Sequence, residues 1–380
     1  MATEQEKLLK LKALLGKLKT KELKRIEEKY KDSIISIKDL IGDGEPSLLF
    51  FLQIRMFGYL LENDPDKTIS ELGVKIRRFI HPMIAKQSPK YLMNPQVIEN
   101  RNYLLSEGVD PSQVAEDKKI ILPEEPVIWI QNHGFKDDAL SSVASIPRHT
   151  YLFFGSIPQF YNSIYGTSAQ LGGVVLMNRK VKESKIASMY KTIELLRNGA
   201  DVLICPEATW NKTPELLQLE YWPGFYKIAQ ETGAKIVPIV HYLRDPFERT
   251  NPIHTVIDDP IDITKYSEKE AVELVRDTMA TWYYLMLEKY GKTTREELLG
   301  GKSYDETWHE FLEKLISEVD YYDFEIESSC DFRSKDNVRA ESVFESVANI
   351  EHITPENASH VAYASNLVRS RKNRDFQRLH

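Results

Sequence analysis

A histidine followed by two carboxylates is the part of this sequence best suited to chemistry. Residues 129–138 read Trp-Ile-Gln-Asn-His-Gly-Phe-Lys-Asp-Asp, so His133 follows an apolar stretch and precedes Asp137 and Asp138. An imidazole whose second nitrogen donates to a fixed carboxylate can take a proton from an alcohol. His133 is therefore the candidate general base. Spacing alone does not choose between the two carboxylates, and the alternative that His133 only caps the next helix stays open.

Two further segments place polar side chains where an apolar stretch ends. Residues 172–179 end at Arg179, whose guanidinium suits a phosphate or a carboxylate. Residues 203–209 end with Glu207 and Thr209, which offer a carboxylate and a hydroxyl. Each segment taken alone is equally compatible with an ordinary strand end, with Arg179 as a surface charge and Glu207 as a residue near a helix cap.

Pro238 interrupts a third apolar stretch, residues 236–240. A central strand tolerates proline poorly because the residue has no backbone N–H to donate. We expect a bulge or a turn there, with a plain strand end as the alternative.

In this order and spacing, the segments resemble the four sequence blocks of the glycerolipid acyltransferase family, of the lysophosphatidic acid acyltransferase type. The resemblance covers about residues 125–263 and leaves both flanking parts uncovered. The first block is matched by Asn132, His133 and Asp138, the second by Gly173 and Arg179, the third by Cys205-Pro206-Glu207-Ala208-Thr209-Trp210, and the fourth by Val237-Pro238.

The resemblance implies roles for these residues. It makes Asp138, rather than Asp137, the carboxylate that orients His133. It implies that Arg179, Glu207 and Thr209 bind the acceptor, with Asn132, Gly173, Pro206 and Pro238 in support. In the third block Ala208 replaces the family's glycine and Trp210 its arginine. One expected phosphate ligand is therefore missing, and Arg179, helped by Lys180 or Lys182, would hold a phosphate without it.

Short apolar runs alternate with helical patterns after residue 111. Strands are expected over residues 127–130, 150–154, 174–177, 202–205, 236–240 and 255–257, and helices over residues 184–197, 223–232 and 267–290. Such alternation predicts an α/β fold, a mostly parallel central sheet flanked by helices, with catalytic loops at the carboxyl ends of its strands.

The chain divides into three expected parts. Residues 1–118 form a mainly α-helical N-terminal region, in which Asn63-Asp64-Pro65-Asp66 and His81-Pro82 separate helical stretches. Its first part, from about residue 4 to 30, is a basic amphipathic helix that either lies on an anionic membrane surface or packs on the protein. Residues 119–292 form the acyltransferase domain, and residues 293–380 a mainly helical or irregular extension.

Composition excludes several classes of protein. The 380 residues carry a net charge of -7, which argues against a nucleic acid partner, and two cysteines are too few for a disulfide framework. We find no secretory signal and no apolar run of about 20 residues, so residues 48–61 are expected to form a buried helix. The expected location is the cytoplasm. Peripheral attachment to the cytoplasmic face of the membrane is the second option.

The resemblance implies an O-acyltransferase that moves a fatty acyl group from acyl-CoA or acyl carrier protein to a glycerolipid or lysophospholipid hydroxyl. No cofactor and no metal are expected, because no His, Cys or carboxylate cluster has ligand spacing. The alternatives are an acyltransferase for a non-phosphorylated acceptor with thioesterase side activity, and a non-catalytic lipid-binding or scaffold protein. Phe154, Leu176 and Met177 are expected to line the acyl chain or simply to fill the core.

Overall fold

The structure is a computed structural model, and it describes part of the chain. The described residues are 4–29, 31, 46–48, 50–51, 71–90, 92, 94–106, 109–135, 137–155, 169, 172–177, 181–208, 217–244 and 249–291. The expected C-terminal extension, residues 293–380, lies outside them, as do residues 52–61 of the expected buried helix. Of that helix, Phe50 and Phe51 are described and buried.

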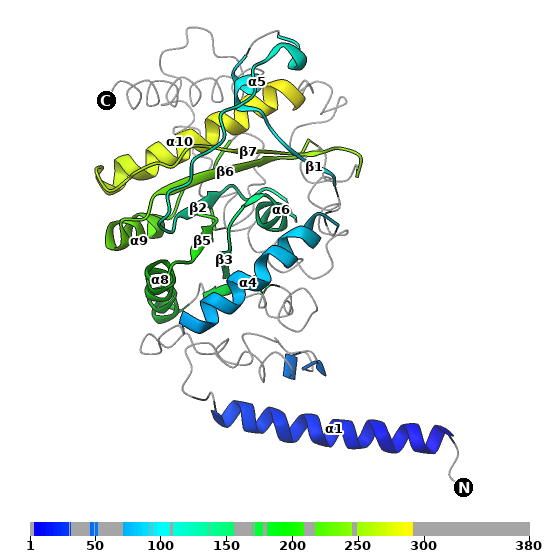
Figure 1. The fold of residues 1–380 in the computed structure, drawn as a ribbon. Coiled ribbons are helices and arrows are strands. Elements are labelled where there is room, and N and C mark those ends of the chain that lie inside the picture. The colour runs from blue at the N-terminus through cyan, green and yellow to red at the C-terminus, as the bar shows by residue number, and fades with distance from the viewer. Residues whose placement is uncertain are drawn as a thin grey trace, which may run out of the picture.

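A seven-stranded sheet forms the centre of the described structure, in the order β1-β7-β6-β2-β5-β3-β4. Its strands are β1 (Gln96–Ile98), β2 (Ile128–Gln131), β3 (Thr150–Gly155), β4 (Val174–Met177), β5 (Asp201–Ile204), β6 (Ile236–Tyr242) and β7 (Ile253–Ile257). Neighbouring strands run parallel, except that β6 and β7 are antiparallel. The expected mostly parallel α/β fold is confirmed (Figure 1).

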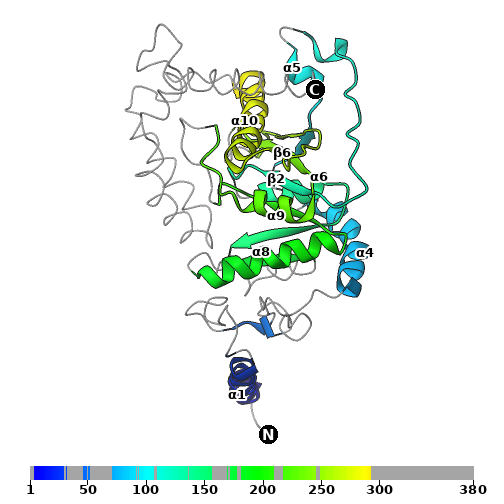
Figure 2. The same ribbon diagram turned by 90° about the vertical axis from the view of Figure 1, so that its left-hand side faces the viewer.

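Helices cover both faces of this sheet. The described helices are α1 (Glu4–Lys29), α4 (Glu71–Gln87), α5 (Arg101–Leu105), α6 (Asp138–Ser145), α8 (Lys182–Arg197), α9 (Gly224–Thr232) and α10 (Glu268–Met286), with short turns η2 (Ser88–Lys90), η3 (Pro111–Gln113) and η5 (Leu287–Gly291), and α1 is the one among them that lies apart from the sheet. Helices α8, α9 and α10 contact one another in sequence, while α6 packs on β6 and α4 packs on α6. Figure 2 shows α8, α9 and α10 one above another along the sheet.

The central strands are buried on both faces, which explains why they read as continuous apolar runs. Every residue of β2 and β6 is buried. Side chains alternate across the sheet, so Ile128 and Ile130 join the larger core under α8, α9 and α10, while Val127 and Trp129 join a smaller core on the other face. Strand β2 is thus held by a neighbouring strand on each side and by a core on each face, so the loop that follows it begins from a rigid strand end.

The strands and helices expected between residues 127 and 290 are all present, with ends that differ by a few residues. Residues 174–177 are a strand with the expected bounds, and the helix expected over residues 267–290 is α10 with Ser267 as its N-cap, followed by η5. Strand β1 was not expected, because it lies in a region predicted to be mainly helical. Three residues, two of them exposed, carry too little apolar pattern to indicate a strand.

The expected break at His81-Pro82 is wrong, because α4 continues through Pro82. Proline removes one backbone hydrogen bond from a helix and would normally end or kink it. Here Pro82 points outward, while Val74 and His81 on the inner face of α4 are buried. Tertiary packing of that inner face holds the helix together across the proline.

The basic helix expected at the N-terminus is present as α1. Figures 1 and 2 show it lying apart from the sheet. Its last turns carry half-buried and buried side chains, among them Ile26 at 4% exposure, so this end of the helix also packs against protein. Within the described ranges, no helix combines the length and apolar character that crossing a bilayer requires.

Candidate active site

His133 and Asp138 touch. The Nδ1 atom of His133 lies 2.8 Å from Oδ2 of Asp138, in the loop that connects β2 to α6. The Asp138 side chain is 1% exposed, whereas that of His133 is 23% exposed. The carboxylate is thus held inside the protein, and the imidazole it orients reaches the surface. Asp137 is the N-cap residue of α6 and makes no side-chain cap hydrogen bond.

Asp138 also shapes the loop that carries His133. Its Oδ2 atom accepts the backbone N–H groups of Gly134 at 2.9 Å and Phe135 at 3.3 Å. Its Oδ1 atom accepts the side-chain amide of Gln131 at 3.3 Å. A carboxylate in the first turn of a helix is favoured by the helix dipole. The position of Asp138 at the start of α6 therefore stabilises its negative charge. The hydrogen bonds that Asp138 accepts hold the loop in place.

Glu207 connects this loop to the neighbouring strand. Its Oε1 atom accepts the backbone N–H of His133 at 3.0 Å, and its Oε2 atom accepts that of Leu219 at 2.8 Å. The side chain is fully buried. Because β5 lies beside β2, a side chain shortly after the end of β5 can hold the backbone shortly after the end of β2. The expected contact of Glu207 with acceptor hydroxyls stays a prediction, and it would share these two oxygens with the backbone.

Pro206 and Ala208 form a tight turn around Glu207. The backbone N–H of Ala208 donates to the carbonyl of Cys205 at 3.0 Å, which places Pro206 at the second position of the turn, where its fixed φ is favourable. Ala208 has a φ of 56°, in the left-handed region that favours glycine. This is the position at which the resembling family has glycine. The carbonyl of Pro206 also accepts the N–H of Trp222 at 3.0 Å.

Asn132 connects β2 to β6. Its side-chain amide donates to the carbonyl of His241 at 2.8 Å, and its side-chain oxygen accepts the N–H of the same residue at 2.8 Å. Both atoms of the side chain are therefore used to extend the sheet beyond the last residue of β2. Asn132 supports His133 by fixing the backbone immediately before it.

Pro238 lies inside β6, opposite Ile130 of β2. Its carbonyl accepts the N–H of Asp258, so its missing N–H faces the same neighbouring segment. On that side, Ile239 pairs with Ile257 and Ile236 with Ile261, a register shift of one residue. The irregularity expected near Pro238 is thus a bulge in the segment opposite it, and β6 itself continues without a turn.

Gly173 is a packing position just before β4. Its φ is 108°, and a Cβ atom there would lie 2.7 Å from the ring of Tyr151. Any side chain would displace that ring or the strand. Its backbone N–H donates to the carbonyl of Ala169 at 2.9 Å. Gly173 therefore supports the fold at the start of the strand that leads towards Arg179.

Several expected site residues are not placed. Arg179, Lys180, Thr209 and Trp210 lie outside the described residues, as does the side chain of Phe154. Of the remaining expected residues, Lys182 is exposed at the start of α8, Leu176 is buried and Met177 is half-buried. Their roles in binding the acceptor and the acyl chain stay predictions. Among the described residues, no group of three or more His, Cys, Asp or Glu side chains could hold a metal ion.

Sequence reasoning missed the residues behind Asp138. They are Gln131, Ser142 and His241, all with 0% exposure. Ser142 stands four positions after Asp138, on the same face of α6, and this spacing was a usable signal. His241 has no comparable signal, because only the pairing of β6 with β2 brings it near.

Residues 112–242 match the family model described as Acyltransferase. This stretch contains β2 to β6 and every described residue of the candidate site. The match therefore shows that residues 112–242 are similar to an acyltransferase domain.

Two curated relatives sharpen the comparison. A 1-acyl-sn-glycerol-3-phosphate acyltransferase of Chlamydomonas reinhardtii is 30% identical over 118 residues, 31% of this chain and 34% of the relative. A chloroplastic enzyme of the same name from Arabidopsis thaliana is 28% identical over 117 residues, 30% of this chain and 32% of the relative. The match thus spans about one third of the length of each of these relatives.

A solved structure is also similar. The crystal structure of the 1-acyl-sn-glycerophosphate (LPA) acyltransferase PlsC from Thermotoga maritima covers 61% of this chain and 93% of its own. The TM-score is 0.38 at 15% sequence identity, which is too low to compare individual residues.

Proposed function

We propose that this protein is an O-acyltransferase that transfers a fatty acyl group from a thioester to the hydroxyl of a glycerolipid or lysophospholipid. The observation that carries the proposal is the 2.8 Å contact between His133 Nδ1 and the buried carboxylate of Asp138. A base of this kind accelerates proton transfer by roughly 100- to 10,000-fold. The match of residues 112–242 to the Acyltransferase family model supports the same chemistry.

The proposed reaction is direct transfer without an acyl-enzyme. Because Nδ1 of His133 faces Asp138, Nε2 is the atom that takes the proton of the acceptor hydroxyl. The alcohol oxygen attacks the thioester carbonyl carbon, the C–S bond breaks, and the proton on His133 neutralises the departing thiolate. Asp138 stabilises the imidazolium between these steps.

The developing oxyanion needs hydrogen-bond donors. The backbone amides of Gly134 and Gly173 already donate within the protein, to Asp138 and to Ala169. The donors therefore come from other groups near His133, or from Gly134 after its hydrogen bond is exchanged.

The proposed acceptor carries a phosphate, as the names of the relatives suggest for those proteins. Arg179 is the proposed phosphate ligand, with Lys180 or Lys182 beside it, and Glu207 and Thr209 are the proposed ligands of acceptor hydroxyls. The donor is acyl-CoA or acyl carrier protein. Trp210, at the family's arginine position, favours one alternative, an acceptor without a phosphate.

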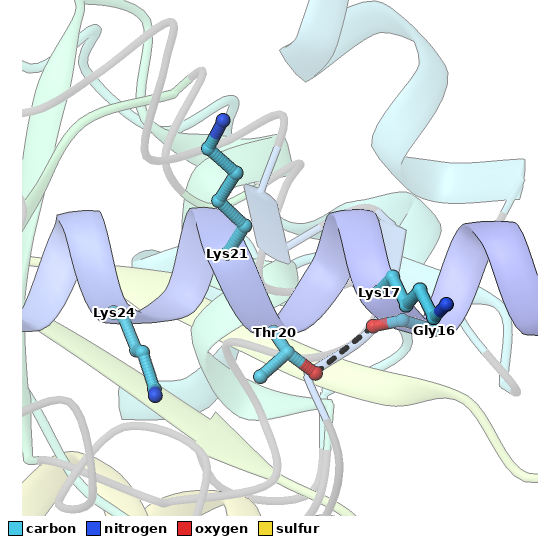
Figure 3. A pocket seen from close by; sticks show the side chains of 5 residues that line it. All are labelled: Gly16, Lys17, Thr20, Lys21 and Lys24. Atoms are coloured by element: carbon cyan, nitrogen blue, oxygen red, sulfur yellow. Dashed lines mark hydrogen bonds between the residues drawn. The ribbon is translucent and has the colours of Figure 1, made fainter.

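Helix α1 is proposed to hold the enzyme on an anionic membrane surface from the cytoplasmic side. The segment from residue 1 to 31 contains ten Lys and Arg against five acidic residues. Figure 3 shows a pocket on α1 lined by Gly16, Lys17, Thr20, Lys21 and Lys24, with Lys21 and Lys24 pointing to opposite sides of the helix. Clustered lysines attract anionic lipid headgroups, an attraction that salt weakens.

Variants of the two neighbouring carboxylates test the function. Purified wild-type protein, His133→Ala, Asp138→Asn and Asp137→Asn are incubated with labelled acyl-CoA or acyl carrier protein and with lysophosphatidic acid, glycerol 3-phosphate or a non-phosphorylated alcohol. We expect His133→Ala to lose roughly 100- to 10,000-fold in kcat. Asp138→Asn is expected to lose activity as well, whereas Asp137→Asn, which preserves the dyad, keeps it.

Other outcomes of this assay would replace the proposal. Equal thioester consumption with and without acceptor would indicate a thioesterase. Transfer unaffected by His133→Ala would indicate that the dyad is not the base. Absence of transfer to every acceptor, with lipid binding that depends on α1, would indicate a non-catalytic lipid-binding protein.

A further inference from the structure

A chain of buried polar side chains leads away from Asp138 into the protein. The side-chain amide of Gln131 donates to Asp138 Oδ1 at 3.3 Å. The hydroxyl of Ser142 donates to the side-chain oxygen of Gln131 at 2.5 Å. Beyond it, Nε2 of His241 lies 2.6 Å from the same hydroxyl. Asp138 is 1% exposed and the other three residues are 0% exposed.

The chain continues past His241 to the far strands of the sheet. Nδ1 of His241 lies 2.9 Å from the hydroxyl of Thr255 in β7 and 3.4 Å from that of Ser141. The side-chain amide of Gln96, in β1, donates to the Thr255 hydroxyl at 3.1 Å and to the backbone carbonyl of Ser141 at 3.0 Å. The polar chain thus crosses the sheet from its edge strand to the candidate site.

The donors and acceptors fix the direction of every proton. The side-chain oxygen of Gln131 can only accept, so Ser142 donates to it and must itself accept from His241 Nε2–H. Nδ1 of His241 then carries a lone pair and accepts from Thr255, whose oxygen accepts from Gln96. All hydrogen bonds therefore point towards Asp138. Hydrogen bonds aligned in this way polarise and strengthen one another.

We propose that His241 is a positioning residue, which acts through Ser142 and Gln131 to hold the Asp138 carboxylate in the orientation that His133 needs. The proposal rests on the acyltransferase function, because it assigns His241 a part in the same reaction. It explains why three uncharged polar side chains are buried behind a carboxylate that already accepts two backbone amides. Gln131 engages Oδ1 and so leaves Oδ2 to face the imidazole.

Electrostatics are consistent with this arrangement. Burial lowers the pKa of His241 to about 4, against a smaller opposing effect of the Asp138 charge. The ring is therefore neutral near pH 7, as the one-way chain requires. Among the described residues, the titratable groups facing the chain are Asp138 and, beyond it, His133, whose backbone is held by Glu207. The groups contributed by α6, β1 and β7 are hydroxyls and an amide.

Two buried serines provide a matched test. Ser142→Ala removes the hydroxyl that joins His241 to Gln131. Ser188→Ala removes an equally buried hydroxyl, in α8, that donates to the backbone carbonyls of Leu176 and Ser184. We expect Ser142→Ala to lower kcat about 10-fold, less than the ~100-fold loss that a full 1 Å displacement of a catalytic group can cause. KM for donor and acceptor is expected to stay unchanged, and Ser188→Ala to match the wild type.

The Nδ1–H proton resonance of His133 gives a readout that does not depend on turnover. Without Gln131 held against Oδ1, more negative charge remains on Oδ2, so the hydrogen bond from His133 Nδ1–H is expected to strengthen in Ser142→Ala and its proton resonance to move downfield. Histidine-selective NMR of the full chain measures this, with His133→Ala identifying the resonance. Ser142→Thr, which restores a hydroxyl, should return both kcat and the resonance towards the wild-type values.

The outcomes separate this inference from the proposed function. An inactive wild-type protein overturns the function, while the NMR measurement still tests the polar chain. An unchanged kcat and an unchanged His133 Nδ1–H resonance in folded Ser142→Ala overturn the inference alone. If circular dichroism shows that Ser142→Ala is unfolded, Thr255→Val tests the chain from its far end. The inference then requires a smaller change in the same direction, and wild-type behaviour overturns it.

Discussion

Asp138 uses a single oxygen for two tasks. Its Oδ2 atom accepts from the His133 ring and from the amides of Gly134 and Phe135. The atom that orients the base therefore also holds the shape of the loop that carries it. A change at Asp138 alters chemistry and geometry together, whereas a change at His133 removes the base and leaves the loop bonded. Comparing the two variants separates these contributions.

Ala208 provides a test of backbone strain beside the site. Its φ of 56° places a side chain in the left-handed region, which costs roughly 1–2 kcal/mol relative to the right-handed form. Ala208→Gly should relieve most of this cost. Because glycine also gains freedom in the unfolded chain, we expect a net stabilisation of about 0.5–1 kcal/mol, measured by urea unfolding.

Ala200→Gly is the control for that prediction. Ala200 is buried and is not among the described non-glycine residues with positive φ. Glycine there adds freedom to the unfolded chain without relieving strain, and the variant should be less stable than the wild type. Equal destabilisation by both substitutions would show that the turn at Ala208 is not strained.

At the scale of elements, the sequence predicts the strands and helices that have a local sequence pattern, such as an apolar run or a helix cap. Buried strands such as β2 and β5 read as apolar runs, and α10 begins with a capping box in which Ser267 and Glu270 bond reciprocally. The pairing of His133 with Asp138 was within reach because five positions of one loop separate them. This spacing is a property of the chain and not of the sheet.

Contacts between strands could not be predicted in this way. Glu207 reaches His133 only because β5 lies beside β2, and His241 reaches Ser142 only because β6 lies on the other side. Strand order is decided by the packing of the whole sheet, and it leaves no mark in local spacing. The polar chain behind Asp138 therefore becomes visible only in the folded protein.

Asp201, the first residue of β5, allows a prediction about how the central strands are held. Its buried carboxylate accepts from the Val127 backbone, the Trp129 indole and the Arg148 guanidinium, at 2.9–3.1 Å. Asp201→Asn would turn one acceptor into a donor that faces these donors. We expect a loss of about 2–3 kcal/mol in the free energy of unfolding, measured with urea.

Asp262→Asn is the matched control for this prediction. Asp262 accepts from the backbone and hydroxyl of Thr264, but its side chain is 35% exposed and water can replace these bonds. Its effect should stay below about 1 kcal/mol. Comparable losses in the two variants would mean that burial of Asp201 adds nothing to the strength of its contacts.

At the scale of the whole molecule, buried histidines make stability depend on pH. Burial lowers the pKa values of His149 and His241 to about 4, and it also lowers the pKa of His81. Between about pH 6.5 and 4 the unfolded chain binds protons that the folded chain does not. Stability is therefore complete above pH 6.5 and falls as the pH drops. The loss is on the order of 3 kcal/mol for each of the two strongly shifted groups by pH 4.

Urea unfolding between pH 7 and pH 5 measures this dependence. His149→Gln removes one of the two strongly shifted groups, and we expect it to flatten the curve visibly over the same interval. A curve of unchanged slope would show that His149 takes up its proton in the folded state as easily as in the unfolded one. Carboxylates contribute mainly at lower pH, which is why the interval ends at pH 5.

Strand β1 forms one edge of the sheet with residues that stand 157 positions before their partners, Gln96 against Ile253. During synthesis it emerges early and must wait, unpaired, until β7 has left the ribosome. Proteolytic cleavage after Ile98 would let β1 dissociate and leave the backbone hydrogen-bonding groups of β7 unpaired on that side. By pairing with β7, strand β1 thus keeps a second copy of the protein from pairing with β7 at that edge.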